Sequence, residues 1–389
     1  MTKEEKLLIN ICQCYITDSN PDINININWE NFYQLAKNHN LIGICHYVFY
    51  KNKQLSVPDN IRQLFMDKFF DLVYIYEQQS NALNDIKQCL TAADVPFITF
   101  KGAVLRNLYP VPESRAMGDI DMLIKADSND KAKNALEQIG FNCNGFNGTV
   151  YDYKRNNVVL ELHTKIISEF GKTAFDDVFD NTVLTENGEQ LDDSYHFAYL
   201  IAHTANHLKN TGAGIRFIID LAVMIKEKSI DYDKVFRILD KINLVTFGEV
   251  MISVCFRWFG YGQLFCENTD KIQEYLIEDG VFGSMKDSIQ STITRLMDCK
   301  AFDSKENKSS FALKIKLAFP PYETLRKAHY IKFLNGRPWL LPFAWTYRIF
   351  YNLNKNRTHM LETVKNIDDE KTTALAQEEL DFFKEIGLI

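Results

Sequence analysis

The chain has 389 residues, of which 46% are hydrophobic and 24% are charged. This composition is typical of globular proteins and excludes long disordered stretches. The formal net charge of −7 argues against a surface built throughout for nucleic acid. The chain shows no signal-peptide pattern and no apolar run of about 18 residues, so we expect no transmembrane segment and a cytoplasmic location.

The first part of the chain has the spacing of amphipathic helices. Apolar residues recur every three to four positions from residue 4 to about residue 88, as in Phe65, Phe69, Leu72 and Tyr76. The asparagine-rich stretch at 21–28 is expected to form a loop. We therefore predict an N-terminal helical region over residues 1–94.

The pattern changes at Pro96, which ends the helical spacing. Short apolar runs then alternate with turns and one amphipathic segment, and Gly140 is placed to end that helix. We predict a small α/β core over residues 95–170, with strands at 97–100, 119–124, 150–153 and 158–166, a short helix from 102 to 109, and a longer helix at 129–139. The pair Asn156-Asn157 favours a hairpin turn between the last two strands.

Beyond about residue 176 the spacing is again helical. We divide this part into a helical substrate region, 171–310, and a basic and aromatic C-terminal helical region, 311–389. The predicted fold class is α+β, a small mixed sheet flanked by helical regions. Helices are predicted at 195–208, 216–226, 232–242, 245–259, 339–354 and 372–386.

Positive charge is concentrated in residues 311–357, which contain nine Lys or Arg against one acid, Glu323. This stretch therefore carries +8 and the remainder −15. It includes the aromatic segment 338–348. Three interpretations stay open: a core with a solvated basic rim, a surface for nucleic acid or another polyanion, and a peripheral membrane contact on anionic lipid.

The candidate reaction centre is the pair Asp119 and Asp121. Side chains alternate along a strand, so both carboxylates project to the same face. Like charges this close destabilise each other, and a divalent cation removes that cost. Carboxylate oxygens suit Mg²⁺ or Mn²⁺, which share their coordination with substrate phosphates. We therefore predict a metal site at these two residues.

A third carboxylate, Glu161, lies in an apolar run predicted to form a neighbouring strand. An acid in such a run needs a partner, so Glu161 is the candidate third metal ligand and catalytic residue. His163 follows two residues later, on the same face of the strand. It is a candidate for a direct role at the metal site, or for a histidine that lies in the core or just outside the metal ligands and bonds to a carboxylate.

Upstream, a strand leads into Lys101-Gly102 and then a helix. Glycine permits close approach and Lys101 supplies charge, so this turn suits a triphosphate. Arg115 can neutralise the triphosphate from the loop side, or it can be a salt-bridge partner that orients Asp119.

Two i, i+4 pairs lie on the predicted helices after the core. His203 and His207 have a spacing that can bind zinc, but we favour packing or substrate contacts. For Arg216 and Asp220, a salt bridge along the helix face is expected.

Together these motifs resemble an uncharacterised bacterial branch of the polymerase-beta-like nucleotidyltransferase superfamily, related to the nucleotidyltransferase toxins of abortive-infection systems. The resemblance is densest over residues 97–165. It implies transfer of a nucleoside monophosphate from an NTP, with metal at Asp119, Asp121 and Glu161. The chain departs from the superfamily at Ala103, where Ser or Gly is common after the turn glycine, and at Glu161, where Asp is more usual.

The function predicted from the sequence is an Mg²⁺-dependent nucleotidyltransferase whose acceptor is a small molecule, a protein or RNA. Asp119, Asp121 and Glu161 are the catalytic and metal residues, and Lys101, Gly102 and Arg115 bind the nucleotide. Two alternatives stay open: a nucleotide-binding regulatory protein without turnover, and a toxin-like enzyme that modifies tRNA.

Overall fold

The structure is a computed structural model. It describes residues 1–21, 26–166, 170–171, 173–185, 188–279, 288–298, 310–326, 330–334, 336–355 and 357–389. The chain divides into two compact units, Met1–Ser284 and Met285–Ile389. The predicted α+β architecture with helical flanks is confirmed, and the four-part division of the chain stays a prediction.

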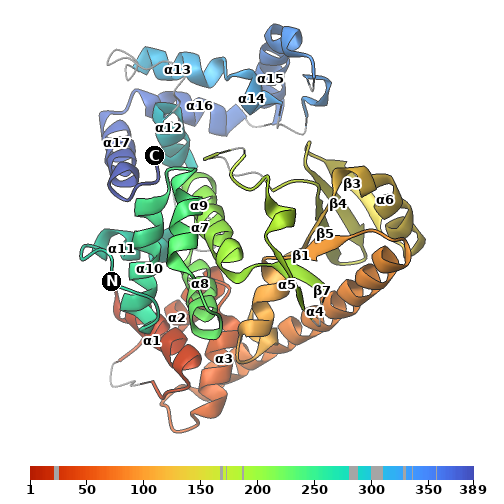
Figure 1. The fold of residues 1–389 in the computed structure, drawn as a ribbon. Helices are drawn as coiled ribbons and strands as arrows, with labels where there is room; N and C mark the ends of the chain where they lie inside the picture. Colours follow the sequence, from red (N-terminus) through yellow and green to blue (C-terminus); the bar gives the residue numbers. More distant parts are fainter. Residues whose placement is uncertain are drawn as a thin grey trace. The chain divides into compact units, whose positions relative to one another are not determined.

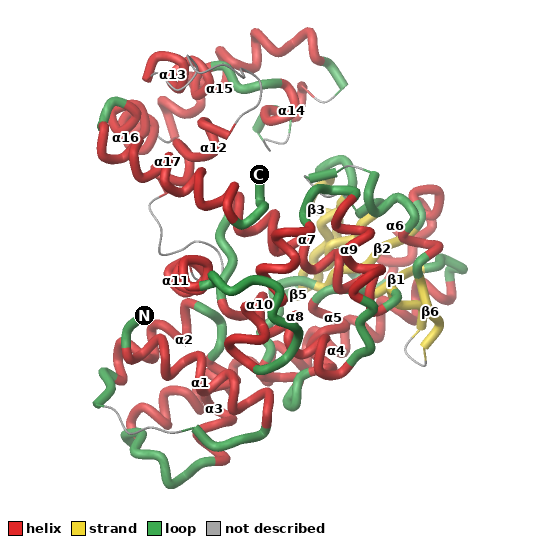
Figure 2. The backbone as a smooth tube through the Cα atoms, turned by 60° about the vertical axis from the view of Figure 1, so that its left-hand side comes forward, coloured by secondary structure: helices red, strands yellow, loops and turns green. Residues whose placement is uncertain are grey.

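The N-terminal part of the first unit is helical, as its spacing predicted. Its last helix is 34 residues long and connects the other three to the sheet: in both views α1–α3 gather at the end of α4 that lies away from the strands (Figures 1 and 2). Part of the predicted loop at 21–28 lies outside the described residues. The helices are α1 (Lys3–Thr17), α2 (Trp29–Asn38), α3 (Ile42–Lys51) and α4 (Asp59–Ala92).

The core of the first unit is a seven-stranded mixed sheet with strand order β3-β4-β5-β2-β1-β7-β6. At its centre β2 pairs with β5 in parallel and with β1 antiparallel. The strands are β1 (Phe97–Thr99), β2 (Ile120–Ile124), β3 (Asn142–Phe146), β4 (Val150–Arg155), β5 (Val158–His163), β6 (Thr182–Thr185) and β7 (Gly188–Leu191).

Each central strand directs alternate residues to opposite faces of the sheet. Ile120, Met122 and Ile124 of β2 and Leu160 and Leu162 of β5 are buried in an apolar core with one face of α4 and with α6 (Asn129–Gln138). The intervening residues of both strands point to the other face. Helix packing therefore fixes which face of the sheet is left for polar side chains.

The hairpin between β4 and β5 forms at the predicted turn. Asn156 adopts a positive φ of 54°, and Arg155 and Val158 pair across the two-residue turn. Gly140 ends α6 with φ of 86°, a conformation that glycine adopts without strain. The predicted helix at 102–109 is shorter: α5 spans Gly102–Leu105 and a 3₁₀ turn follows over Arg106–Leu108. No strand was predicted for β3, β6 and β7.

The helices α7 to α10 form where the spacing predicted them, and no helix was predicted for α11. Phe100 contacts Tyr199 of α7 with ring centroids 5.7 Å apart, so α7 packs toward the polar face of the sheet, opposite α4. The helices are α7 (Asp193–Asn210), α8 (Ile215–Glu227), α9 (Tyr232–Asp240), α10 (Val245–Phe259) and α11 (Asp270–Asp279).

The second unit is helical and has two small apolar cores. The aromatic rings of segment 338–348 differ in exposure: Trp345 donates a hydrogen bond to the carbonyl of Pro320, whereas Trp339 and Phe343 are about 70% exposed, as is Phe350 just after the segment. The interpretation as core therefore fails for Trp339 and Phe343. The helices are α12 (Ser288–Asp298), α13 (Ser310–Ala318), α14 (Tyr322–Leu325), α15 (Leu341–Lys355), α16 (Arg357–Ile367) and α17 (Glu370–Glu385).

None of the helices among the described residues is both long enough and apolar enough to cross a bilayer.

Candidate active site

Two neighbouring strands bring the predicted carboxylates together. Asp121 on β2 and Glu161 on β5 are direct partners in the parallel register, and Leu123 is the partner of His163. Because Asp121, Glu161 and His163 alternate with the buried apolar residues, all three face the same side. Each offers one ligand atom, and these atoms lie within 4.8 Å of one another.

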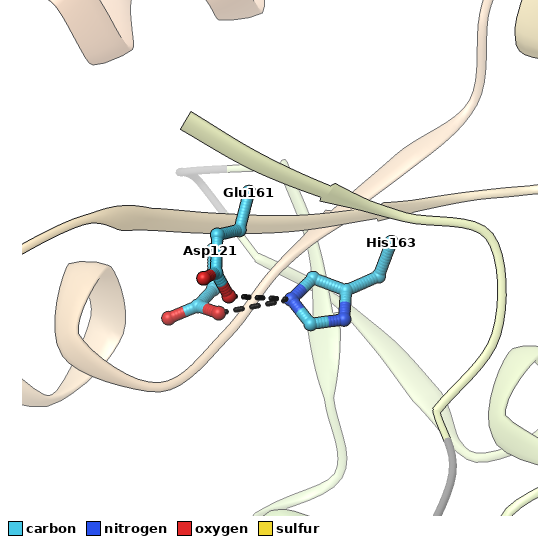
Figure 3. A group of neighbouring side chains, drawn as sticks. All are labelled: Asp121, Glu161 and His163. Carbon is cyan, nitrogen blue, oxygen red and sulfur yellow. Dashed lines mark hydrogen bonds and ion pairs between the residues drawn. The ribbon is translucent and has the colours of Figure 1, made fainter. Parts of the chain in front are cut away.

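Figure 3 shows His163 beside Asp121 and Glu161, with a dashed line from its ring to each carboxylate. Asp121 Oδ1 accepts from Lys101 Nζ at 2.6 Å and lies 3.0 Å from His163 Nε2. His163 Nε2 is also 3.5 Å from Glu161 Oε2. The imidazole therefore bridges the two carboxylates.

The cluster shifts the pKa of its members in opposite directions. Burial raises the pKa of Asp121, but Lys101 and His163 outweigh burial and hold that pKa below its usual range. Burial raises the pKa of Asp119 to about 6, and the charges of Asp121 and Glu161 add to the rise. Burial lowers the pKa of His163, but its bonds to the two carboxylates raise it overall. The site thus has more negative charge than Lys101 offsets.

Asp119 occupies a different place from its predicted partner. It precedes the first residue of β2 and lines a pocket together with Asp121 and Glu161. It does not belong to the three-residue group whose ligand atoms lie within 4.8 Å of one another. The sequence predicted that Asp119 and Asp121 lie a few ångströms apart on one face of the strand, whereas the group of ligand atoms in the structure consists of Asp121, Glu161 and His163. The reason is that residues directly opposite each other on neighbouring strands lie closer together than residues two positions apart on one strand.

Lys101 and Gly102 form the turn between β1 and α5. Lys101 has φ 49° and ψ −132°, a conformation costly for a residue other than glycine. Its N–H donates to His196 Nε2 of α7 at 3.0 Å. Burial lowers the pKa of His196 to about 4, so the imidazole is neutral and can accept this bond. His196 was missed because a histidine in an apolar helix carries no distinctive signal.

Two side chains approach Gly102 closely. A Cβ at this position would lie 2.9 Å from Arg115 Nη1 and 2.8 Å from Met117 Sδ. The turn predicted to bind phosphate therefore lies directly against the guanidinium of Arg115. Of the two roles weighed for Arg115, the structure places one guanidinium nitrogen at the turn, and the salt bridge that Arg115 forms is with Asp220 rather than with Asp119.

The salt bridge of Arg115 is with Asp220 of α8. Nε donates to Oδ1 at 2.7 Å and Nη2 donates to Oδ2 at 2.8 Å. The hydroxyl of Tyr109 also donates to Oδ1, at 2.7 Å. Asp220 was expected to pair with Arg216 along its own helix, but its carboxylate faces Arg115 across the fold.

One pocket of about 440 Å³ in the first unit is lined by most of the site residues, namely Lys101, Gly102, Arg115, Asp119, Asp121, Glu161 and Asp220. Its walls come from α4, the Gly102 turn, β2, β5, α7 and α8. His203, His207 and Arg216 of α7 and α8 also line it, and burial lowers the pKa of both histidines. Neutral imidazoles in a pocket wall agree with packing or substrate contacts rather than with a cationic role.

A further acid, Asp152, was overlooked in the sequence. It is the partner of Glu161 in the antiparallel register of β4 and β5, and burial together with Glu161 raises its pKa. The signal was present, because counting back from the two-residue turn Asn156-Asn157 places Asp152 opposite Glu161.

A comparison with known proteins found one matching family and one distantly similar structure. A family model described as uncharacterised nucleotidyltransferase matches residues 26–260. The solution structure of the antibiotic-resistance factor ANT(2'')-Ia is similar over 42% of this chain and 89% of that chain, with 10% identity and a TM-score of 0.34. That likeness is too distant to carry an argument. No match was found among curated proteins.

Proposed function

Because the chain belongs to the family of uncharacterised nucleotidyltransferases, we propose that it transfers a nucleoside monophosphate from an NTP to a hydroxyl of an acceptor, using a divalent metal ion. One observation carries the proposal: Asp121 and Glu161 are paired in register on neighbouring strands, in the same pocket as the Gly102 turn. A carboxylate pair beside a turn suited to phosphate is the arrangement that metal-assisted phosphoryl transfer requires.

The charge of the pocket supports this assignment. At the acidic end of the pocket Asp119, Asp121 and Glu161 lie near Lys101, which pairs with Asp121, and these four side chains carry a formal charge of −2. Burial of unbalanced carboxylates is unfavourable, and it already raises the pKa of Asp119. Hard oxygen donors of this kind fit Mg²⁺ or Mn²⁺.

We assign the metal to Asp121 and Glu161, with Asp119 as the third carboxylate. The bound ion supplies polarisation of the α-phosphate and offsets the charge that develops there. His163 holds Asp121 and Glu161 in position through Nε2. Lys101, Gly102 and Arg115 seat the triphosphate, and their fixed positions lower the entropy cost of aligning it.

In the proposed reaction one proton is transferred, one bond to the α-phosphorus forms and another breaks. The acceptor oxygen bonds to the α-phosphorus, the bond from that phosphorus to the bridging oxygen breaks, and pyrophosphate leaves with the electron pair. The carboxylate of Glu161 takes the proton of the acceptor hydroxyl. Its side chain is 32% exposed, so it faces the pocket and can pass the proton to solvent.

The test is an assay with labelled NTPs, Mg²⁺ or Mn²⁺, and a panel of small-molecule, protein and RNA acceptors. Asp119→Asn combined with Asp121→Asn should abolish the transfer seen in the wild type. Asp127→Asn, in the exposed loop after β2, is the matched control and should retain it. Far-UV circular dichroism of the three proteins checks that the loss is not unfolding.

Two results would contradict the proposal. Transfer that persists in the double variant would remove the metal assignment. Tight NTP binding by the wild type without transfer to any acceptor would favour the alternative, a nucleotide-binding regulatory protein.

RNA is a second candidate for the acceptor, favoured by one observation in the second unit. Trp339, Phe343 and Phe350 expose their rings within a stretch that carries +8. Aromatic rings with basic neighbours can stack on bases and bind the backbone. Retention of tRNA that falls steeply with salt would support this acceptor. Equal retention by Phe343→Ala combined with Phe350→Ala would count against it.

A further inference from the structure

Arg216 lies in the first turn of α8 and lines the pocket beside the predicted site. Its Nη1 donates to the carbonyl of Ala116 at 3.1 Å, which holds the guanidinium in place. Its Nε is buried and has no hydrogen-bond partner within the described part of the chain. A buried guanidinium donor without a partner is unfavourable unless a ligand supplies the acceptor.

The charges around Arg216 do not balance within the protein. Asp220 is four residues away on the same helix, but its two oxygens already accept three hydrogen bonds, two from Arg115 and one from Tyr109. Arg115, Arg216 and Asp220 together carry a formal charge of +1. Burial lowers the pKa of Arg216, and the neighbouring charge of Arg115 lowers it further.

The acids of the pocket do not neutralise Arg216 directly. Asp119 and Glu113 line the same pocket, yet neither forms an ion pair with Arg216 among the residues that the structure describes. The pocket therefore has an acidic end at Asp121 and Glu161, suited to a cation, and a basic end at Arg115 and Arg216, suited to an anion. A metal-bound polyphosphate has both charges in this order.

We propose that Arg216 binds the terminal phosphates of the NTP and then the pyrophosphate leaving group. This inference rests on the proposed function, because the phosphates must lie between the carboxylates and α8. It assigns the anion-binding role to a residue outside the Lys101-Gly102 turn. Arg115 contributes Nη1 beside Gly102, while Asp220 engages its other two nitrogens.

The experiment measures binding of inorganic pyrophosphate, NTP and NMP to the full chain by calorimetry. Arg216→Met should weaken pyrophosphate and NTP binding about 10- to 100-fold, the loss expected for charge-assisted hydrogen bonds. NMP binding should change little, because an NMP lacks the two terminal phosphates.

Arg155→Met is the matched control. Arg155 also donates Nη1 to a backbone carbonyl, that of Ile139, at 3.1 Å. It pairs with Asp85 and does not line the pocket, so its loss should leave all three affinities unchanged. Arg216→Lys keeps the charge without the guanidinium, and its pyrophosphate affinity should fall between those of the wild type and Arg216→Met.

A second measurement needs no variant. Pyrophosphate should protect Arg216 of the wild type from phenylglyoxal, read by mass spectrometry of peptides, while Arg155 reacts equally with and without it. Unchanged pyrophosphate affinity in Arg216→Met, equal losses for pyrophosphate and NMP, or labelling of Arg216 despite pyrophosphate would overturn the inference.

The two proposals fail differently. If the wild type binds pyrophosphate through Arg216 but transfers no nucleotide, the anion site stands and the proposed function falls. If NTP is turned over equally well by Arg216→Met and the wild type, the function stands and this inference falls.

Discussion

The buried ion pair between Arg115 and Asp220 should make a large contribution to the stability of the first unit. Both side chains are less than 10% exposed, and the carboxylate accepts three hydrogen bonds. The change Asp220→Asn keeps the shape but leaves the Arg115 guanidinium buried without its counter-charge. Breaking one partner of a buried pair costs about 3–5 kcal/mol. At roughly 2–4 °C per kcal/mol for a domain of this size, Tm should fall by about 6–20 °C.

The assay is thermal and urea unfolding, followed by far-UV circular dichroism. Arg257→Gln is the control, because it breaks the ion pair between Arg257 and Glu267. Their side chains are 38% and 86% exposed, and exposed pairs contribute less than about 1 kcal/mol to stability. A double variant, Arg115→Met with Asp220→Leu, should recover stability relative to Asp220→Asn, since apolar side chains replace both charges. If Asp220→Asn stays within about 1 kcal/mol of the wild type, the reasoning on burial is wrong.

Three other changes test the site. Gly102→Ala should raise the KM for NTP more than it lowers kcat, because the new Cβ meets Arg115 Nη1 at 2.9 Å; an unchanged KM would contradict the close approach. Glu161→Gln should weaken Mn²⁺ binding at least about tenfold, measured by electron paramagnetic resonance, and a loss no larger than that of Asp152→Asn would remove Glu161 from the ligands. The folded-state pKa of His196, about 4, lies below the usual 6.5, so the unfolded chain binds the proton first and stability falls as pH drops from 6.5 toward 4. Between pH 7 and 4.5 protonation linked to His196 should lower the free energy of unfolding by about 2.5 kcal/mol. The variant His196→Gln, which can still accept the N–H of Lys101, should show a shallower pH dependence of the urea midpoint. Equal slopes would refute the assignment.

The sequence by itself determined the elements whose signals are local. Alternation along the strands placed Asp121 and Glu161 opposite the apolar residues of β2 and β5, because a pleated strand has a period of two. The pair Asn156-Asn157 gave the hairpin and with it the register of β4 and β5. Gly140 marked the end of α6, since its positive φ suits glycine.

Pairings between distant parts of the chain required the tertiary structure. The strand β7 joins the sheet in parallel with β1, about 90 residues later in the chain, and such a pairing leaves no periodic mark on either segment. The hydrogen bond from the backbone N–H of Lys101 to His196 likewise leaves no mark in the sequence of either segment. Residue propensity and spacing report on residues that are close in sequence. Burial of apolar surface determines which strands become neighbours and which helix packs on the sheet.

The arginines of the pocket show this limit most clearly. Spacing along α8 favoured a pair between Arg216 and Asp220, and the loop before β2 offered Arg115 to the nucleotide. Folding brings Arg115 to Asp220, 105 positions away, because two buried charges are stable only when each meets a partner of good geometry. The sequence predicted that Lys101, Gly102 and Arg115 bind the nucleotide, and only the tertiary structure showed that Arg216 lines the same pocket with a buried Nε that has no hydrogen-bond partner among the described residues.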